Sequence, residues 1–298
     1  MDIVNSAASG SLEQIDIELS QRIEDILVAK NLRGMKHAQQ FLTSGYYYRA
    51  AKIVDENKGT VLIGTGFPVT DTFETDGPVG AICLYNTLEQ CGYNPVLVCG
   101  DPLFSALKDD YRCHQLMLGD AKSSVVEVVD ILSDLKPDLV ISIERPGRTV
   151  DGSYRNMRGE DISARCACFD DYIELAQCPT IGIGDGGNEI GMGNIAEQLA
   201  NSEHFVSIKP SVTRCGELLI ADVSNWAAYG LIAFLSLWQR QDLLKTIKPL
   251  DILQYLSDKG SVDGVTRLNT LTEDSLEVSA GEDVIAQIRK VCQFNLWD

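Results

Sequence analysis

The sequence has little positive charge and few histidines. Its 298 residues include 25 lysines and arginines against 43 aspartates and glutamates, which gives a formal net charge of −18. Such a chain repels phosphate backbones and anionic lipid surfaces, and no Lys/Arg cluster with interleaved aromatic residues compensates locally. We therefore expect neither nucleic acid nor a membrane as a partner.

The sequence also lacks a long hydrophobic run and a paired-cysteine motif. No apolar run approaches the roughly 20 residues that cross a bilayer, and no early segment has the pattern of a signal peptide, so we expect a cytoplasmic protein. The nine cysteines are an odd number without a CxxC, and there are only three histidines. This pattern favours buried, reduced thiols over a disulfide framework or a zinc site.

Short apolar runs alternate with helical patterns from residue 60 onward. The runs are rich in Val, Ile and Leu, as expected for parallel strands that are covered on both faces. We therefore predict an α/β fold, with a doubly wound, mostly parallel sheet and helices on both faces in a Rossmann-like three-layer arrangement. The predicted strands are Thr60–Ile63, Val96–Cys99, Gln115–Leu118, Leu139–Ile143, Thr180–Ile183 and Leu218–Ala221, and the predicted helices between them are 78–91, 122–135, 161–177, 194–201 and 224–239.

The chain is expected to form a single α/β domain over residues 1–298. An N-terminal helical segment (1–58) contains an S-x-x-Q capping box at Ser11 and a second helix from Met35 to about Asp55. The α/β core with the motif loops covers 59–245. A C-terminal extension (246–298) ends in a predicted helix over 282–292.

Four unusual loops follow predicted strands. In an open α/β sheet, ligands bind beyond the carboxyl ends of the strands, so these loops are expected to meet around one cleft. They are "GTGFPVTDTFETDGPVG" from Gly64, "ERPGRTVDGSYRNMRG" from Glu144, "GDGGNEIGMGN" from Gly184 and "DVSNWAAYG" from Asp222.

The first loop begins with Gly64, Thr65 and Gly66 and reaches a helix at Asp76 and Gly77. It is neither a dinucleotide fingerprint, because the third glycine is missing, nor a P-loop, because no Gly-Lys-Ser/Thr follows. Asp76 is a suitable N-cap for the helix that follows it. The loop either forms a tight strand-to-helix turn or presents backbone N–H groups to a carboxylate or phosphate.

The second loop concentrates arginines. Guanidinium groups bind carboxylates in a bidentate fashion, so this loop is a candidate for holding an acidic ligand, although a solvated loop of mixed charge is the alternative. Its charged residues are Glu144, Arg145, Arg148, Asp151, Arg155 and Arg158.

The third loop combines glycines with carboxylates. Gly186 and Gly187 let a ligand approach the main chain, while Asp185 or Glu189 could act as a general acid or base. Asp185, Asn188 and Glu189 could instead bind a hard divalent cation such as Mg²⁺, and a purely structural turn is the third interpretation. In the fourth loop, Asp222 and Asn225 are candidates for lining the pocket. The aromatic residues after them, Trp226 and Tyr229 among them, are expected in the core.

Together, "IGTGFP" with "ETDGPVGA", "IERPGR" with "DGSYRNMRG", "GDGGNEIGMG" and "VSNW" resemble the D-glutamate cyclase C-terminal domain family over roughly residues 60–240. The resemblance implies a hydro-lyase that interconverts D-glutamate and 5-oxo-D-proline plus water. It would need no cofactor, with Mg²⁺ left open. Its substrate would be a small acidic amino acid. A homodimer and a separately encoded partner domain both stay open.

The resemblance also implies roles for the candidate residues. Asp185, Glu189 and Glu144 are the candidate catalytic carboxylates, Arg145 and Arg148 would hold the α-carboxylate, and glycine-loop N–H groups would stabilise the oxyanion. The candidate substrate-binding residues are Gly64, Thr65, Gly66, Asp76, Gly77, Arg145, Arg148, Asp151, Arg155, Gly186, Gly187, Asn188 and Asn225.

Two other functions stay open at this point. One is a Mg²⁺-dependent enzyme that acts on a phosphate or nucleotide, with Gly64–Gly66 near the anion and Asp185 and Glu189 on the metal. The other is a non-catalytic ligand-binding subunit that works with a partner domain.

Overall fold

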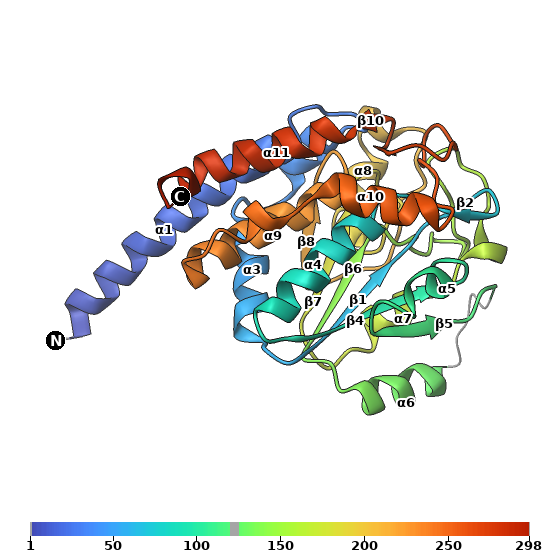
Figure 1. Cartoon of the computed structure of the whole chain (residues 1–298), viewed down its shortest axis with the longest axis horizontal. Coiled ribbons are helices and arrows are strands. Elements are labelled where there is room, and N and C mark those ends of the chain that lie inside the picture. The colour runs from blue at the N-terminus through green and yellow to red at the C-terminus, as the bar shows by residue number, and fades with distance from the viewer. Residues whose placement is uncertain (1, 120–124, 298) are drawn as a thin grey trace.

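The computed structural model describes residues 2–119 and 125–297, and its centre is a six-stranded parallel sheet (Figure 1). The strand order is β5-β4-β1-β6-β7-β8, so the sheet grows outwards from β1 in one direction and from β6 in the other. This is a doubly wound order with its switch point between β1 and β6. The strands are β1 (Thr60–Thr65), β4 (Asn94–Gly100), β5 (Cys113–Leu116), β6 (Leu139–Ile143), β7 (Thr180–Gly184) and β8 (Glu217–Ile220).

All six predicted strands and the predicted three-layer α/β class are confirmed, with β5 placed slightly earlier than expected. The central strands β1, β6 and β7 are buried on both sides, whereas the edge strand β5 is partly exposed. Val61 and Ile63 of β1 join one core, whereas Leu62 joins the core on the opposite face. This alternation explains why the central strands are nearly continuously apolar in sequence.

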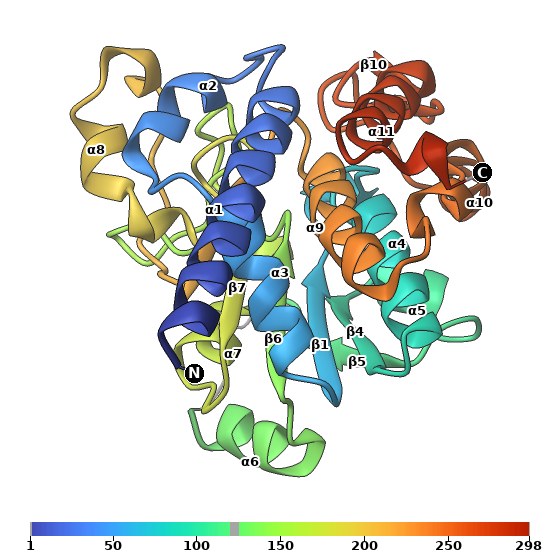
Figure 2. The same ribbon diagram turned by 90° about the vertical axis from the view of Figure 1, so that its left-hand side faces the viewer.

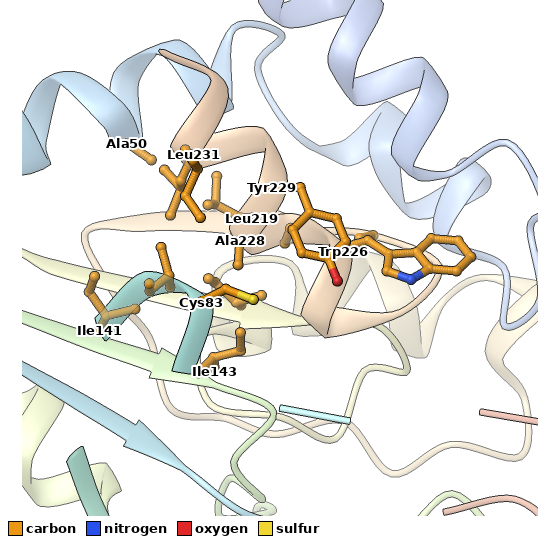
Figure 3. Packing of buried hydrophobic residues seen from close by; sticks show 14 of the residues in the cluster. Ala50, Cys83, Ile141, Ile143, Leu219, Trp226, Ala228, Tyr229 and Leu231 are labelled. Carbon is orange, nitrogen blue, oxygen red and sulfur yellow. The ribbon is translucent and has the colours of Figure 1, made fainter. Parts of the chain in front are cut away.

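Helices α3 (Tyr46–Glu56), α4 (Pro78–Gln90) and α9 (Ser224–Gln239) cover the first face of the sheet, and α5 (Leu103–Leu107) adds to the same core. On α9, Trp226, Tyr229 and Leu231 are fully buried against sheet and helix residues, as expected for core positions (Figure 3). Helices α6 (Val125–Leu135) and α7 (Asp170–Glu174) lie on the second face.

The two terminal segments form an outer layer on the first face. Helix α1 (Asp2–Leu27) packs against α3 and runs beside α11 (Val278–Val291), as Figures 1 and 2 show. The C-terminal extension also contains α10 (Pro249–Asp258) and a short hairpin of β9 (Thr272–Glu273) and β10 (Leu276–Glu277). Within the described residues, no helix has both the length and the hydropathy of a membrane span.

Several helix boundaries differ from the sequence predictions. Helix α1 begins at Asp2, upstream of the predicted cap at Ser11. The predicted helix from Met35 to Asp55 is interrupted: α2 (Met35–Ala38) and a 3₁₀ turn (Gln39–Phe41) precede α3, which starts after Gly45 at a φ of +91°. Helix α8 (Ala196–Ala200) is shorter than predicted, α11 starts earlier than residue 282, and positions 122–124 of the predicted helix 122–135 lie outside the described residues.

The predicted helix over 161–177 is wrong. The segment contains only a 3₁₀ turn (Ser163–Arg165) and the five-residue α7. Asp170 is fully buried, and it accepts hydrogen bonds from the Tyr154 hydroxyl at 2.7 Å and the Arg148 backbone N–H at 2.9 Å. These tertiary contacts fix the local backbone and override the helical periodicity of the sequence.

Candidate active site

A cavity of about 200 Å³ lies beyond the carboxyl ends of the central strands. Glu144 directly follows β6 and Asp185 directly follows β7, so the strand ends themselves deliver two of its carboxylates. We use the name acidic floor for the buried carboxyl groups that line it: Glu74, Glu144, Asp185, Glu189 and Asp274. We use the name arginine mouth for the more exposed guanidinium groups that line it: Arg158, Arg165 and Arg267.

Glu144 occupies a backbone conformation that is unusual for a residue with a side chain. Its φ is +46°, and its carboxyl group is turned back toward α9, where Oε2 accepts a 2.5 Å hydrogen bond from the Ser224 hydroxyl. Gly77 makes this position possible, because a Cβ on Gly77 would lie only 2.6 Å from Cβ of Glu144. Burial, followed by the charge of Glu189, raises the pKa of Glu144 well above its ordinary value.

Glu189 lies beside Glu144 but has different partners. Its Oε2 accepts the Gly187 backbone N–H at 2.8 Å, and a side chain on Gly184 would collide with it. Burial raises the pKa of Glu189, while N–H groups of the glycine loop act in the opposite direction. The glycines of this loop therefore let the Glu189 carboxylate fold back and bind the N–H of its own turn.

Arg33 joins three distant parts of the chain. It follows α1, and its guanidinium forms ion pairs with Asp185 of the core and Asp274 of the C-terminal extension. Burial alone would lower the pKa of Arg33, but the two carboxylates raise it well above its ordinary value. Burial also raises the pKa of Asp185, against the effect of Arg33. Asp274 itself has a φ of +50°, which is the left-handed region.

Helices α4 and α9 cap one another. The prediction that Asp76 caps its own helix is wrong: Gly77 holds the N-cap position of α4. Asp76 instead accepts backbone N–H bonds from Ser224 at 3.0 Å and Asn225 at 2.8 Å, at the start of α9. In return, Asn225 Oδ1 accepts the Gly80 N–H of α4 at 2.7 Å. These helix ends are thus satisfied by side chains and do not face the cavity with free N–H groups.

The arginines of the second loop mostly serve other partners. Arg145 is buried and donates to the backbone carbonyls of Thr65, Gly66 and Ala167. Arg148 pairs with Asp171 and Glu174, each at 2.7 Å. The candidate residues outside the lining of the 200 Å³ cavity are Gly64, Thr65, Gly66, Asp76, Gly77, Arg145, Arg148, Asp151, Arg155, Gly187 and Asn225. The candidates that do line it are Glu144, Asp185, Gly186, Asn188 and Glu189, together with Arg158 of the second loop.

Asp222, a further sequence candidate, also lies outside this lining. Its carboxylate accepts the backbone N–H groups of Lys30 at 2.6 Å and Leu32 at 3.3 Å. Asp222 therefore holds the loop that carries Arg33 into the site.

Two sets of three carboxyl residues have the spacing of a site for a hard cation. Oxygens of Asp76, Asp185 and Asp274 lie within 4.8 Å of one another, and so do those of Glu144, Asp185 and Glu189. Asp185 belongs to both groups. Oxygen donors of this type suit Mg²⁺ or Ca²⁺.

Sequence reasoning missed several residues of the cavity. Glu74 lies inside the first quoted loop, so the loop itself was a signal for it. Arg33, Arg267 and Asp274 belong to segments without a recognisable motif, and only the folded chain brings them to the strand ends.

Comparison with known proteins identifies relatives of the chain. The family described as D-glutamate cyclase-like, C-terminal, matches residues 23–289. Human mitochondrial D-glutamate cyclase is 29% identical over 195 residues, which cover 58% of this chain and 32% of the human protein. The chain thus spans about a third of the length of this curated relative.

Proposed function

Because the chain belongs to the D-glutamate cyclase-like, C-terminal family, we propose that it is a hydro-lyase that interconverts D-glutamate with 5-oxo-D-proline and water. The observation that carries the proposal is the polarity of the cavity: buried carboxyl groups form its floor and three arginines its mouth. Such a cavity suits a small folded substrate that directs one carboxylate toward the arginines and its amine and reacting carboxyl group toward the acidic floor. We propose the cytoplasm as its compartment, whereas the human relative is named as mitochondrial.

Glu144 and Glu189 divide the proton chemistry in this proposal. Both are buried, but Glu189 receives backbone N–H bonds that favour its ionised form, whereas the carboxyl group of Glu144 has one hydrogen-bond partner among the described residues, the Ser224 hydroxyl. Two neighbouring carboxyl groups in unequal surroundings suit an acid and base pair. Glu189 is thus the base that accepts a proton from the substrate ammonium, and Glu144 is the acid.

The reaction moves two protons from nitrogen to the departing oxygen. The amine attacks the γ-carboxyl carbon, a C–N bond forms, and one C–O bond breaks to release water. Glu144 protonates the departing oxygen, and Glu189 accepts the first ammonium proton. Because oxygens of Glu144, Asp185 and Glu189 lie within 4.8 Å of one another, the second proton can pass through the same group. General acid and base groups of this kind contribute about 10²–10⁴-fold each.

The rest of the catalytic effect comes from positioning. Amine and carboxyl group belong to one molecule, so the protein has to hold one folded rotamer of the substrate. The proposal requires no cofactor.

Chiral chromatography of the purified protein with D-glutamate, and separately with 5-oxo-D-proline, tests this function. We expect turnover by the wild type, a loss of about 10²–10⁴-fold in kcat for Glu144→Gln, and wild-type activity for the control Glu89→Gln. Glu89 is exposed near the end of α4 and lies outside the cavity lining. No turnover by the wild type would refute the function, and an active Glu144→Gln variant would refute the assignment of the acid.

The two sets of three carboxyl residues that share Asp185 favour a second candidate function. A divalent cation on Asp185, with Asn188 and Glu189 or with Asp76 and Asp274, would support a Mg²⁺-dependent enzyme that acts on a phosphate or nucleotide. A thermal shift with Mg²⁺ and nucleotide, without one for D-glutamate, would favour this function over cyclisation.

The coverage of the human relative favours a third candidate. Since the chain spans 32% of that protein, a partner domain could supply part of the activity. Binding of D-glutamate or 5-oxo-D-proline without turnover, followed by turnover when the partner is added, would identify a ligand-binding subunit.

A further inference from the structure

The arginines that line the cavity differ in how their guanidinium groups are engaged. Arg33 is paired with Asp185 and Asp274. Arg267 pairs with Glu160 at 2.8 Å, and Arg158 donates to the Val265 carbonyl at 2.9 Å. An incoming anion would have to compete with each of these contacts.

Arg165 is the exception among the arginines of the cavity lining. Within the described part of the chain, its guanidinium makes no hydrogen bond or ion pair, yet the residue is half-buried. It lines both the 200 Å³ cavity and a smaller neighbouring cavity, together with Phe67 and Pro68. A partly desolvated, unpaired cation beside apolar side chains interacts more strongly with an anion than a fully hydrated one.

The backbone around Arg165 is well fixed. Arg165 ends the 3₁₀ turn Ser163–Arg165, and its N–H donates to the Ile162 carbonyl at 2.9 Å. Ile162 and Cys166, on either side of this turn, are buried. The free guanidinium therefore projects from an ordered support, which lowers the entropic cost of binding a ligand.

We propose that Arg165 binds the non-reacting α-carboxylate of the substrate and makes the site selective for it. This inference rests on the function proposed above. The reacting γ-carboxyl group and the amine have to lie near Glu144 and Glu189 on the acidic floor, so the α-carboxylate points toward the mouth. There, Arg165 can form a bidentate contact without breaking an ion pair.

The test compares D-glutamate with its α-amide, D-isoglutamine, as substrates of the 298-residue chain. Both can cyclise at the γ-carboxyl group, but only D-glutamate offers Arg165 a carboxylate. We expect the wild type to prefer D-glutamate in kcat/KM by about 10- to 100-fold, the effect of one charge-assisted contact. In Arg165→Gln, KM for D-glutamate should rise by a similar factor while kcat stays within about threefold, and the preference should disappear. Arg165→Lys should restore part of it.

Arg112→Gln is the matched control, because Arg112 is exposed and lies outside the cavity lining. It should keep the wild-type substrate preference. A wild type that turns over D-glutamate with a preference that Arg165→Gln leaves unchanged would overturn the role of Arg165 alone. A wild type that cyclises neither compound would overturn the proposed function, and this inference with it. Circular dichroism would show whether Arg165→Gln folds. If it does not fold, the wild type and Arg165→Lys decide the test. A wild type without a preference for D-glutamate would overturn the inference, and so would an Arg165→Lys variant that keeps the full wild-type preference.

Discussion

Glutamine in place of Glu273 should protect the protein against unfolding at alkaline pH. Glu273 lies in β9 of the C-terminal hairpin and is only 1% exposed. Its Oε1 accepts a hydrogen bond from Asn225 Nδ2 at 2.7 Å, and its Oε2 accepts a longer one from Trp226 Nε1 at 3.4 Å. Burial, and next the charge of Asp76, raises its pKa from 4.5 to about 8.

The size of the effect follows from this difference in pKa. In the unfolded chain the carboxyl group ionises near 4.5, whereas in the folded protein it stays protonated until about pH 8. The folded state therefore binds more protons between these values, and the free energy of unfolding falls as the pH rises through this window. At about 1.4 kcal/mol per tenfold change, a pKa difference of about 3.5 corresponds to a loss of up to about 5 kcal/mol.

Urea denaturation at pH 5, 7 and 9 checks this prediction. Glutamine does not ionise, so Glu273→Gln should lose about 3–5 kcal/mol less than the wild type between pH 5 and pH 9. The exposed control Glu89→Gln should follow the wild-type curve. Parallel curves for wild type and Glu273→Gln would refute the reasoning, because they would mean that burial does not keep this carboxyl group neutral.

Three further predictions concern the supports of the site. Asp222→Asn keeps only one acceptor for the N–H groups of Lys30 and Leu32. The loosened Arg33 loop should lower kcat in the D-glutamate assay by about 5- to 150-fold, which corresponds to a loss of about 1–3 kcal/mol. Asn225→Asp places an oxygen opposite the carbonyl of Thr75 and Oε1 of Glu273, so urea denaturation at pH 9 should show a loss of about 1–3 kcal/mol. Asp274→Asn removes a charge that helps raise the pKa of Asp76 to about 7, so the carboxyl titration of Asp76, followed by ¹³C NMR, should move to lower pH; an unchanged midpoint would contradict the assigned cause.

The sheet could be predicted from sequence because its information is local. Runs such as Leu139–Ile143 are apolar at every position, and strands of this kind occur in parallel sheets covered on both faces. The helix predicted over 161–177 failed for the opposite reason. The conformation of Asp170 depends on Tyr154 and Thr213, and no periodicity within the segment reports these contacts.

The same difference between local and long-range information decides which residues of the candidate site could be predicted. Glu144 and Asp185 could be found because each directly follows a strand, where parallel α/β sheets bind ligands. Arg33 could not be found, because its ionic partners Asp185 and Asp274 lie 152 and 241 residues away along the chain. The sequence also does not show which arginines are free to bind a ligand. The second loop is rich in arginines, but the guanidinium of Arg145 is already engaged by backbone carbonyls.

The acidic floor is costly to the fold, and this cost is informative. Removing an ionised carboxylate from water costs several kcal/mol unless a counter-charge compensates for it. Within the described residues, Arg33 is the counter-charge that forms ion pairs with the acidic floor, and its partners in these ion pairs are Asp185 and Asp274. Glu74 and Glu144 have pKa values well above the ordinary range because burial disfavours their ionised forms. Burial raises the pKa of Asp185 as well, and there the charge of Arg33 opposes the rise. Carboxyl groups whose ionisation is shifted in this way are unfavourable for packing, but they suit the proposed reaction, which moves two protons within one small molecule.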